Sequence, residues 1–105
     1  MIRISILYPN IENGRFDKDY YLNIHMPLSI EKQGEALKGI SVEIGINGGN
    51  PETKPPYVAM CHLLYDSIES FWTAFTPHAE LLTGDMINYT DIQPLYQVSE
   101  VSIYK

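Results

Sequence analysis

The sequence predicts an α+β domain with a four-stranded antiparallel sheet and two helices. Four stretches have the apolar patterns of strands, two others repeat apolar residues with the spacing of an amphipathic helix, and turn-forming residues separate them. The chain of 105 residues has the size of one domain and is too short for two. A single domain over residues 1–105 is therefore expected.

The N-terminal third predicts one strand and the start of one helix. Apolar residues recur at every second position over residues 2–8, which is typical of a strand. A helix is expected to begin at Asp17, whose carboxylate can accept hydrogen bonds from the free N–H groups of the first turn. Phe16 and Tyr21 stand at the two positions of a hydrophobic staple. Pro27 is expected to kink or restart this helix.

The middle of the chain predicts a return to the sheet. Residues 28–37 are helical in pattern, and Gly39 is expected to cap them in the left-handed conformation. Residues 40–47 alternate apolar and polar side chains, as a half-buried strand does. Residues 47–56 are rich in Gly and Pro, which predicts a loop that acts as a hinge or lid beside a cavity. Residues 57–65 are largely apolar on both faces, as in a central strand.

The last third predicts a second helix and a fourth strand. Asp66 and Glu69 are spaced as a capping box at a helix start. Thr76-Pro77 predicts that this helix is interrupted and restarts. Residues 94–104 are strand-like, and a change of phase over residues 98–101 predicts a bulge.

This β-α-β-β-α-β order is that of the ferredoxin-like fold, in which two helices cover one face of the sheet. The strand at 57–65 offers apolar residues to both faces, so the second face is expected to pack on something else, most economically on the same face of a second copy. The sequence therefore predicts a homodimer that closes a two-sheet barrel. A monomer with one solvated face is the alternative.

Charge and composition exclude several classes of partner. Thirteen acidic residues against seven basic ones give a net charge of −6, whereas binding to a phosphate backbone requires a basic stripe. Neither nucleic acid nor an anionic membrane is therefore an expected partner. The sequence shows neither a signal peptide nor an apolar run of ~18 residues, and Cys61 is its single cysteine. A cytoplasmic location is expected.

A family resemblance adds to this pattern. Tyr8-Pro9-Asn10 and Arg15-Phe16-Asp17-x-x-Tyr20-Tyr21-x-x-x-His25-Met26-Pro27-Leu28 resemble the signature of the EthD family. The resemblance covers almost the whole chain, including residues 56–58, 71–80, 85–91 and 97–99. It implies a dimeric α+β barrel related to muconolactone isomerases, polyketide-type cyclases and quinol monooxygenases. The family takes its name from a gene cluster for ethyl tert-butyl ether degradation, which implies a role in small-molecule catabolism.

His25 and Tyr21 are the first candidates for chemistry. His25 lies on the apolar face of the first helix, beside the proline, where a neutral imidazole can act as a general base or acid. The alternative is a core histidine that donates a hydrogen bond to a carbonyl freed by the proline. Tyr21 or Tyr20 could place a phenol near the same cavity, although Tyr21, as the staple partner, is more typical of an amphipathic core residue.

Three other residues carry weaker predictions. His62 is a further catalytic candidate, because a buried histidine on a central strand is costly unless it is paired. His78 is expected to be exposed or to cap a helix. Cys61 alternates with His62 along the strand, so the two cannot form a nucleophile pair, and packing is the favoured role of the thiol.

No cofactor or metal is predicted. The histidines at 25, 62 and 78 match no recognised metal-ligand spacing, although ligands can also converge from distant positions. Haem ligation by one histidine, as in related barrels, is an alternative that the sequence leaves open. Gly48-Gly49 is not a phosphate loop, because neither a Lys-Ser/Thr pair nor a helix follows it.

Three hypotheses of function follow. In the first, the chain is an enzyme whose cavity holds a small oxygenated hydrophobic or aromatic compound, and His25 moves a proton in a cofactor-free isomerisation, cyclisation or oxygen insertion. In the second, it is a non-catalytic accessory protein or ligand carrier of a degradation pathway. In the third, it is a structural dimer module without an enclosed cavity.

Overall fold

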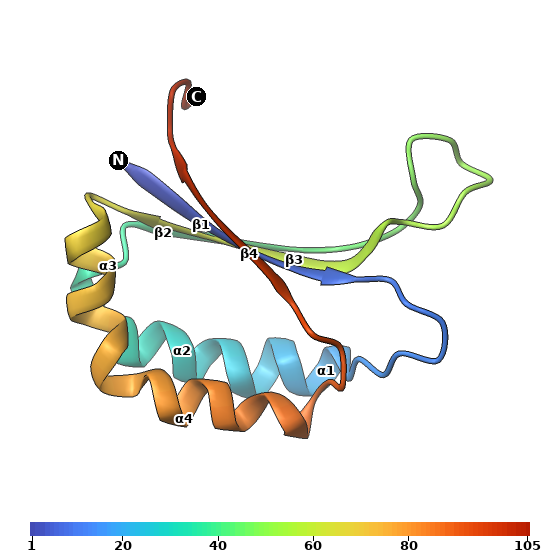
Figure 1. The fold of residues 1–105 in the computed structure, drawn as a ribbon, viewed down its shortest axis with the longest axis horizontal. Helices are drawn as coiled ribbons and strands as arrows, with labels where there is room; N and C mark the ends of the chain where they lie inside the picture. The colour runs from blue at the N-terminus through green and yellow to red at the C-terminus, as the bar shows by residue number, and fades with distance from the viewer.

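The sheet has four antiparallel strands in the order β2-β3-β1-β4. A computed structural model describes residues 1–105, and the strands span Ile2–Pro9 (β1), Gly39–Ile44 (β2), Tyr57–Tyr65 (β3) and Leu95–Glu100 (β4). Figure 1 shows the helices gathered below one face of this sheet, with both termini at one end. The α+β, ferredoxin-like arrangement predicted from the sequence is confirmed.

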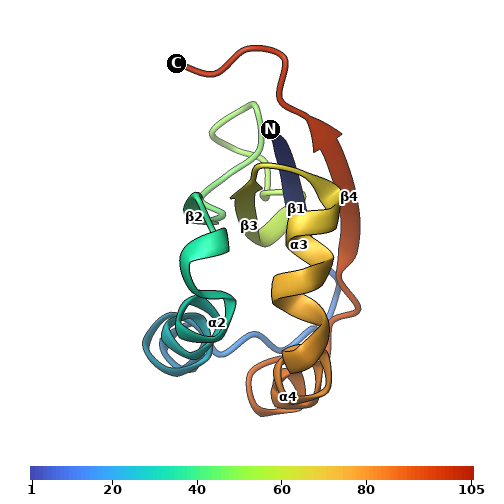
Figure 2. The ribbon, with the colours of Figure 1, turned by 90° about the vertical axis from the view of Figure 1, so that its left-hand side faces the viewer.

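Two helical segments cover that face, and each consists of short pieces of different helix type. The first segment is formed by α1 (Lys18–Tyr20), the π-helix η1 (Tyr21–His25), α2 (Met26–Gln33) and the 3-10 turn η2 (Gly34–Ala36). The second is formed by α3 (Ile68–Phe75), η3 (Thr76–His78), α4 (Ala79–Gly84) and η4 (Asp85–Asn88). Figure 2 shows the two segments side by side under the strands. No helix combines the length and the apolar composition that a membrane-spanning segment needs.

The strand register sorts side chains between the two faces of the sheet. Ile4 of β1 lies opposite Leu63 of β3 and Val98 of β4, and this set points toward the helices. Its neighbour Ser5 lies opposite His62 and points to the uncovered face, because side chains alternate along a strand. The main cluster of buried apolar residues thus lies on the face that the helices cover.

The predicted interruption at Pro27 takes the form of a change of helix type. Asp17 caps the helix as predicted, since its side chain accepts a hydrogen bond from the Tyr20 N–H. The π-helix η1 follows, and it closes with the Met26 N–H donating to the Tyr21 carbonyl. Pro27 then occupies the first turn of α2, and His25 and Met26 before it keep helical dihedral angles, so the segment changes helix type there without a break.

Two predicted details, a helix cap and a β-bulge, are wrong. Gly39 does not cap the first helix; that position belongs to Gly34, with φ 65°, and Gly39 is already in β2 opposite Leu64. The chain leaves the helix earlier than expected because glycine adopts positive φ without steric cost. The bulge predicted over residues 98–101 is absent, since β4 pairs with β1 without a register shift and ends at Glu100.

The cap of the second helix also differs from the prediction. Ser67, not Asp66, is the N-cap: its side-chain oxygen accepts a hydrogen bond of 3.1 Å from the Ser70 N–H. Asp66 is exposed. The spacing from Asp66 to Glu69 resembled a capping box, but the helix begins one residue later, at Ile68.

The cap assignment predicts different effects for two adjacent substitutions. Ser67→Ala should lower the free energy of unfolding by about 1 kcal/mol, because a first-turn N–H loses its acceptor. Asp66→Ala should change it by less than about 0.5 kcal/mol, as is usual for exposed positions. Urea unfolding followed by circular dichroism measures both. Equal effects at the two positions would contradict the assignment of Ser67.

Candidate functional site

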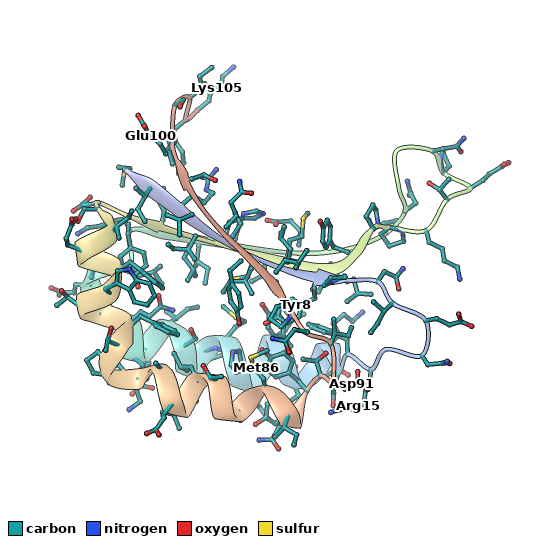
Figure 3. All side chains as sticks on the ribbon, in the orientation of Figure 1. Tyr8, Arg15, Met86, Asp91, Glu100 and Lys105 are labelled. Atoms are coloured by element: carbon teal, nitrogen blue, oxygen red, sulfur yellow. The ribbon has the colours of Figure 1, made fainter.

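A mainly apolar cavity lies between the sheet and the two helical segments. Its larger part has a volume of about 320 Å³, and a smaller part of about 60 Å³ reaches His25. The two parts are adjacent, since they share the lining residues Ile6, Leu63, Phe75, Thr83 and Tyr96. Trp72 borders the larger part and is the single tryptophan of the chain. Figure 3 shows Tyr8, from β1, and Met86, from η4, in the space between the layers. Ligand sites are typically of this size and character.

His25 is the principal titratable group on the cavity wall. It ends the π-helix η1, is 8% exposed and lines the smaller part of the cavity. Its Nδ1 lies 2.9 Å from Oδ2 of Asp85, the first residue of η4. Residues 60 positions apart in the sequence therefore meet where the last piece of the second helical segment packs against the first segment.

Asp85 is held by two further donors. The Tyr20 hydroxyl donates to Oδ1 over 2.6 Å, and the Asn88 amide donates to the same oxygen over 2.9 Å. Burial alone would raise the pKa of Asp85, but the hydrogen bonds from Tyr20, Asn88 and His25 outweigh it, so that this pKa is lowered. The carboxylate is therefore ionised at neutral pH and can only accept hydrogen bonds.

The His25–Asp85 pair determines which ring nitrogen carries the hydrogen when the histidine is neutral. Because the Asp85 carboxylate is an acceptor, Nδ1 of His25 carries the hydrogen, and the Nε2 lone pair stays free for a proton. Two aromatic rings hold the imidazole in place: Tyr21 is stacked on it at 5.7 Å, and Tyr89 lies 4.6 Å away. An imidazole oriented by a carboxylate in this way is able to act as a general base.

Tyr21 supports this histidine without lining the cavity. Its side chain is 1% exposed, and burial, with Cys61 close by, raises its pKa. The Phe16 ring lies 5.0 Å from the Tyr21 ring, so the hydrophobic staple has formed. Tyr20, the other phenol considered, contacts Asp85. The structure therefore brings both tyrosines to His25, one by stacking and one through the carboxylate.

His62 lies elsewhere. It points to the uncovered face of the sheet, where Nδ1 is 2.8 Å from the Ser5 hydroxyl and Nε2 is 3.3 Å from the Glu43 carboxylate. The sheet separates it from His25. Cys61 points the opposite way, into the core, and burial raises the pKa of its thiol to about 12. His78 borders neither part of the cavity.

Two other features take no part in this site. The Gly- and Pro-rich loop projects away from the helices (Figure 1), and none of its residues lines the cavity, so the expected lid is wrong. The loop connects β2 with β3. No three His, Cys, Asp or Glu side chains are grouped so as to hold a metal ion.

Sequence reasoning missed Asp85 and Tyr89 as site residues. Tyr89 is fully buried, and its hydroxyl lies 2.8 Å from that of Tyr8. No spacing rule links these positions to His25, because the contact depends on how the two helical segments meet. The one available signal was the segment from Asp85 to Asp91, which forms part of the EthD resemblance.

The paired carboxylate predicts a specific pH dependence of stability. Since folding lowers the pKa of Asp85 below its ordinary value of 3.8, its contribution is present above that value and is lost as the pH falls through the folded pKa. The stability difference between the wild type and Asp85→Asn should therefore be greatest above about pH 5 and shrink below about pH 4. Thermal unfolding across this range measures it. The exposed Asp66→Asn is the control, and a difference for Asp85→Asn that does not change with pH would contradict the ionised pair.

Comparison with known proteins places this chain in a family. Residues 15–93 match the EthD domain. An EthD-like protein from Ralstonia eutropha JMP134 is 39% identical, with a TM-score of 0.94 over 99% of this chain and 94% of the other. An ethyl tert-butyl ether (EthD) family protein from Bacillus halodurans C-125 is 24% identical, with a TM-score of 0.72 over 95% and 97% of the two chains.

The fold extends to more distant proteins. A dimeric protein of unknown function with a ferredoxin-like fold, from Bacteroides fragilis NCTC 9343, is 11% identical and has a TM-score of 0.59 over 94% of each chain. At this identity the likeness is one of fold alone. A search of the curated proteins found no match. The domain match covers most of the residues, and the Ralstonia protein is similar over nearly all of them: this chain belongs to the EthD family.

Proposed function

We propose that this protein binds a small, largely apolar, oxygenated compound in the cavity and moves a proton on it with His25 as the base. The observation that carries the proposal is that His25, on the wall of an otherwise mainly apolar cavity, is paired with the Asp85 carboxylate. A role in small-molecule catabolism agrees with family membership, and the ether for which the family is named favours an oxygenated ligand.

The chemistry follows from the geometry of the pair. Nε2 of His25 takes a proton from the bound compound, and the Asp85 carboxylate stabilises the imidazolium that forms. The apolar walls strengthen this charge interaction by limiting contact with water. Return of the proton to a second atom of the same compound gives an isomerisation or a cyclisation, with His25 neutral again at the end.

A second candidate function is that of a non-catalytic carrier. The larger part of the cavity favours it, because eight of its nine lining residues are hydrophobic, and neither a histidine nor a carboxylate lines it. A carrier would bind the same compounds and leave their protons in place. The enzyme and the carrier thus differ in one measurable reaction, the transfer of a proton from the bound compound.

We further propose that two copies associate through the uncovered sheet faces. The central positions of this face include half-buried apolar residues, Leu7 and Met60, which lie opposite each other in β1 and β3, and no helix covers them. The related Bacteroides protein is described as dimeric, which supports an association of this kind. His62 and Glu43 would then lie within the interface, where each would need its partner because unpaired buried charge is costly.

Proton transfer can be tested with a simple ketone. Cyclohexanone in D₂O should exchange its α-protons faster with the wild type present, and His25→Gln should abolish this acceleration, because glutamine can donate to Asp85 but has no basic nitrogen. NMR measures the exchange, and quenching of Trp72 fluorescence measures binding in parallel. His78→Gln is the matched control. Binding without exchange would support the carrier instead, and exchange that survives His25→Gln would exclude His25 as the base.

The association has its own test. Wild-type protein should have the mass of two chains in size-exclusion chromatography with light scattering. Met60→Lys should shift it to one chain, since a charge would be buried in the interface. Ile30→Lys, at an exposed apolar position of α2, should leave the dimer intact. A monomeric wild-type chain would contradict the association and leave the cavity proposal untouched.

A further inference from the structure

We infer that the cavity offers the ligand a second polar contact besides His25. The Ser29 hydroxyl, one helical turn from His25, donates a hydrogen bond to a carbonyl oxygen of the bound compound. This inference rests on the proposed function and deepens it by naming the ligand as a small apolar carbonyl compound: a ketone, an ester or a lactone. Three buried side chains carry the argument.

A chain of hydrogen bonds runs from the core to the cavity. The Tyr65 hydroxyl bonds to Oε1 of Gln33, and Nε2 of Gln33 bonds to the Ser29 hydroxyl oxygen over 2.8 Å. Tyr65 is 0% exposed, while Gln33 and Ser29 are both buried and line the smaller part of the cavity beside His25. Buried polar groups in such number are costly unless each has a partner.

The amide of Gln33 sets the direction of these bonds. Burial raises the pKa of Tyr65 to about 12, so the phenol keeps its proton and has to donate it. The Gln33 carbonyl accepts that proton, which leaves the Gln33 NH₂ group to donate to Ser29. The opposite orientation of the amide would leave the Tyr65 O–H without an acceptor in the core, at a cost of roughly 1–3 kcal/mol.

Ser29 therefore ends the chain as a donor. Its oxygen is already an acceptor for Gln33, and its own hydrogen has no acceptor among the hydrogen bonds of the structure. Since Ser29 borders the cavity, that hydrogen is available to a ligand oxygen. A carbonyl group supplies an acceptor of the right kind, whereas a hydrocarbon would leave the donor unpaired.

The placement of Ser29 relative to His25 suits one chemistry. The two residues are four positions apart on one helix face, with a rise of about 6 Å between them. A carbonyl oxygen at Ser29 thus puts a nearby carbon of the same compound toward His25. Nε2 takes a proton from that carbon, the C–H electron pair forms the enolate C=C bond, and the negative charge on oxygen is stabilised by Ser29. The imidazolium returns a proton to the same carbon, which gives exchange, or, where a double bond is conjugated with the enolate, to the γ-carbon, which gives an isomerisation.

One alternative donor lies in the same part of the cavity. The hydroxyls of Tyr8 and Tyr89 are 2.8 Å apart, so one donates to the other and the second keeps a free hydrogen. Tyr8 is 3% exposed and Tyr89 is 0% exposed, and both border the smaller part. This pair shares no hydrogen bond with Gln33. Substitutions can therefore separate it from Ser29.

The test compares two probes of similar shape, cyclohexanone and methylenecyclohexane, in which a CH₂ group replaces the carbonyl oxygen. Binding is followed by Trp72 fluorescence and NMR titration. Ser29→Ala should weaken cyclohexanone about five- to tenfold more than methylenecyclohexane. Gln33→Glu at pH 8 should do the same with Ser29 in place, because a carboxylate accepts from both neighbours and turns the serine proton away from the cavity. Ser29→Thr, which keeps the hydroxyl, should restore the difference.

Each outcome decides a different point. Equal weakening of both probes by Ser29→Ala would overturn the inference, and so would a selective loss of cyclohexanone in Tyr8→Phe but not in Ser29→Ala. In both cases the cavity would still bind its probes, and the proposed function would stand. Failure of both probes to bind the wild type would overturn the proposed function and the inference with it. Should Ser29→Ala fail to fold by circular dichroism, Gln33→Glu supplies the same comparison.

Discussion

The contact of Tyr89 with its aromatic neighbours holds the end of the second helical segment against the first. Tyr89 is fully buried, and its ring lies within 5.0 Å of Tyr21 and 4.6 Å of His25. Its backbone carbonyl accepts a 2.7 Å hydrogen bond from the Asp17 N–H, just where the first helical segment begins. Because each such aromatic pair adds about 0.5–1.5 kcal/mol beyond the area buried, the junction both closes the fold and orients the imidazole.

The site follows from that junction. Strand β1 places Tyr8 on the face of the sheet that packs against the helices. The π-helix η1 directs both Tyr21 and His25 into the core. The second segment then supplies Asp85 four residues before Tyr89. A single packing arrangement thus determines the stability of this end of the molecule and the tautomer of the histidine. Wide helical turns of this type occur frequently at functional sites, because they shift side chains out of the ordinary helical register.

Much of the fold could be predicted from local pattern. The alternation in the strands, the Asp17 cap and the staple of Phe16 with Tyr21 are properties of neighbouring residues, and they appear in the structure as expected. The errors fell at element ends, where Ser67 and Gly34 competed with equally plausible residues. The partner of His25 could not be predicted at all, since its contact with Asp85 depends on the angle between two helical segments. A lone sequence contains no rule for that angle.

Cys61 gives the fold a built-in reporter of its own opening. The thiol is 1% exposed on the central strand, and burial raises its pKa to about 12, so in the folded state it is neither reachable nor ionised. Reaction with a thiol reagent requires the thiolate and access to the sulfur. Cys61 is the single cysteine of the chain, so no engineered probe is needed. Its labelling rate therefore reports how often β3 separates from the helices.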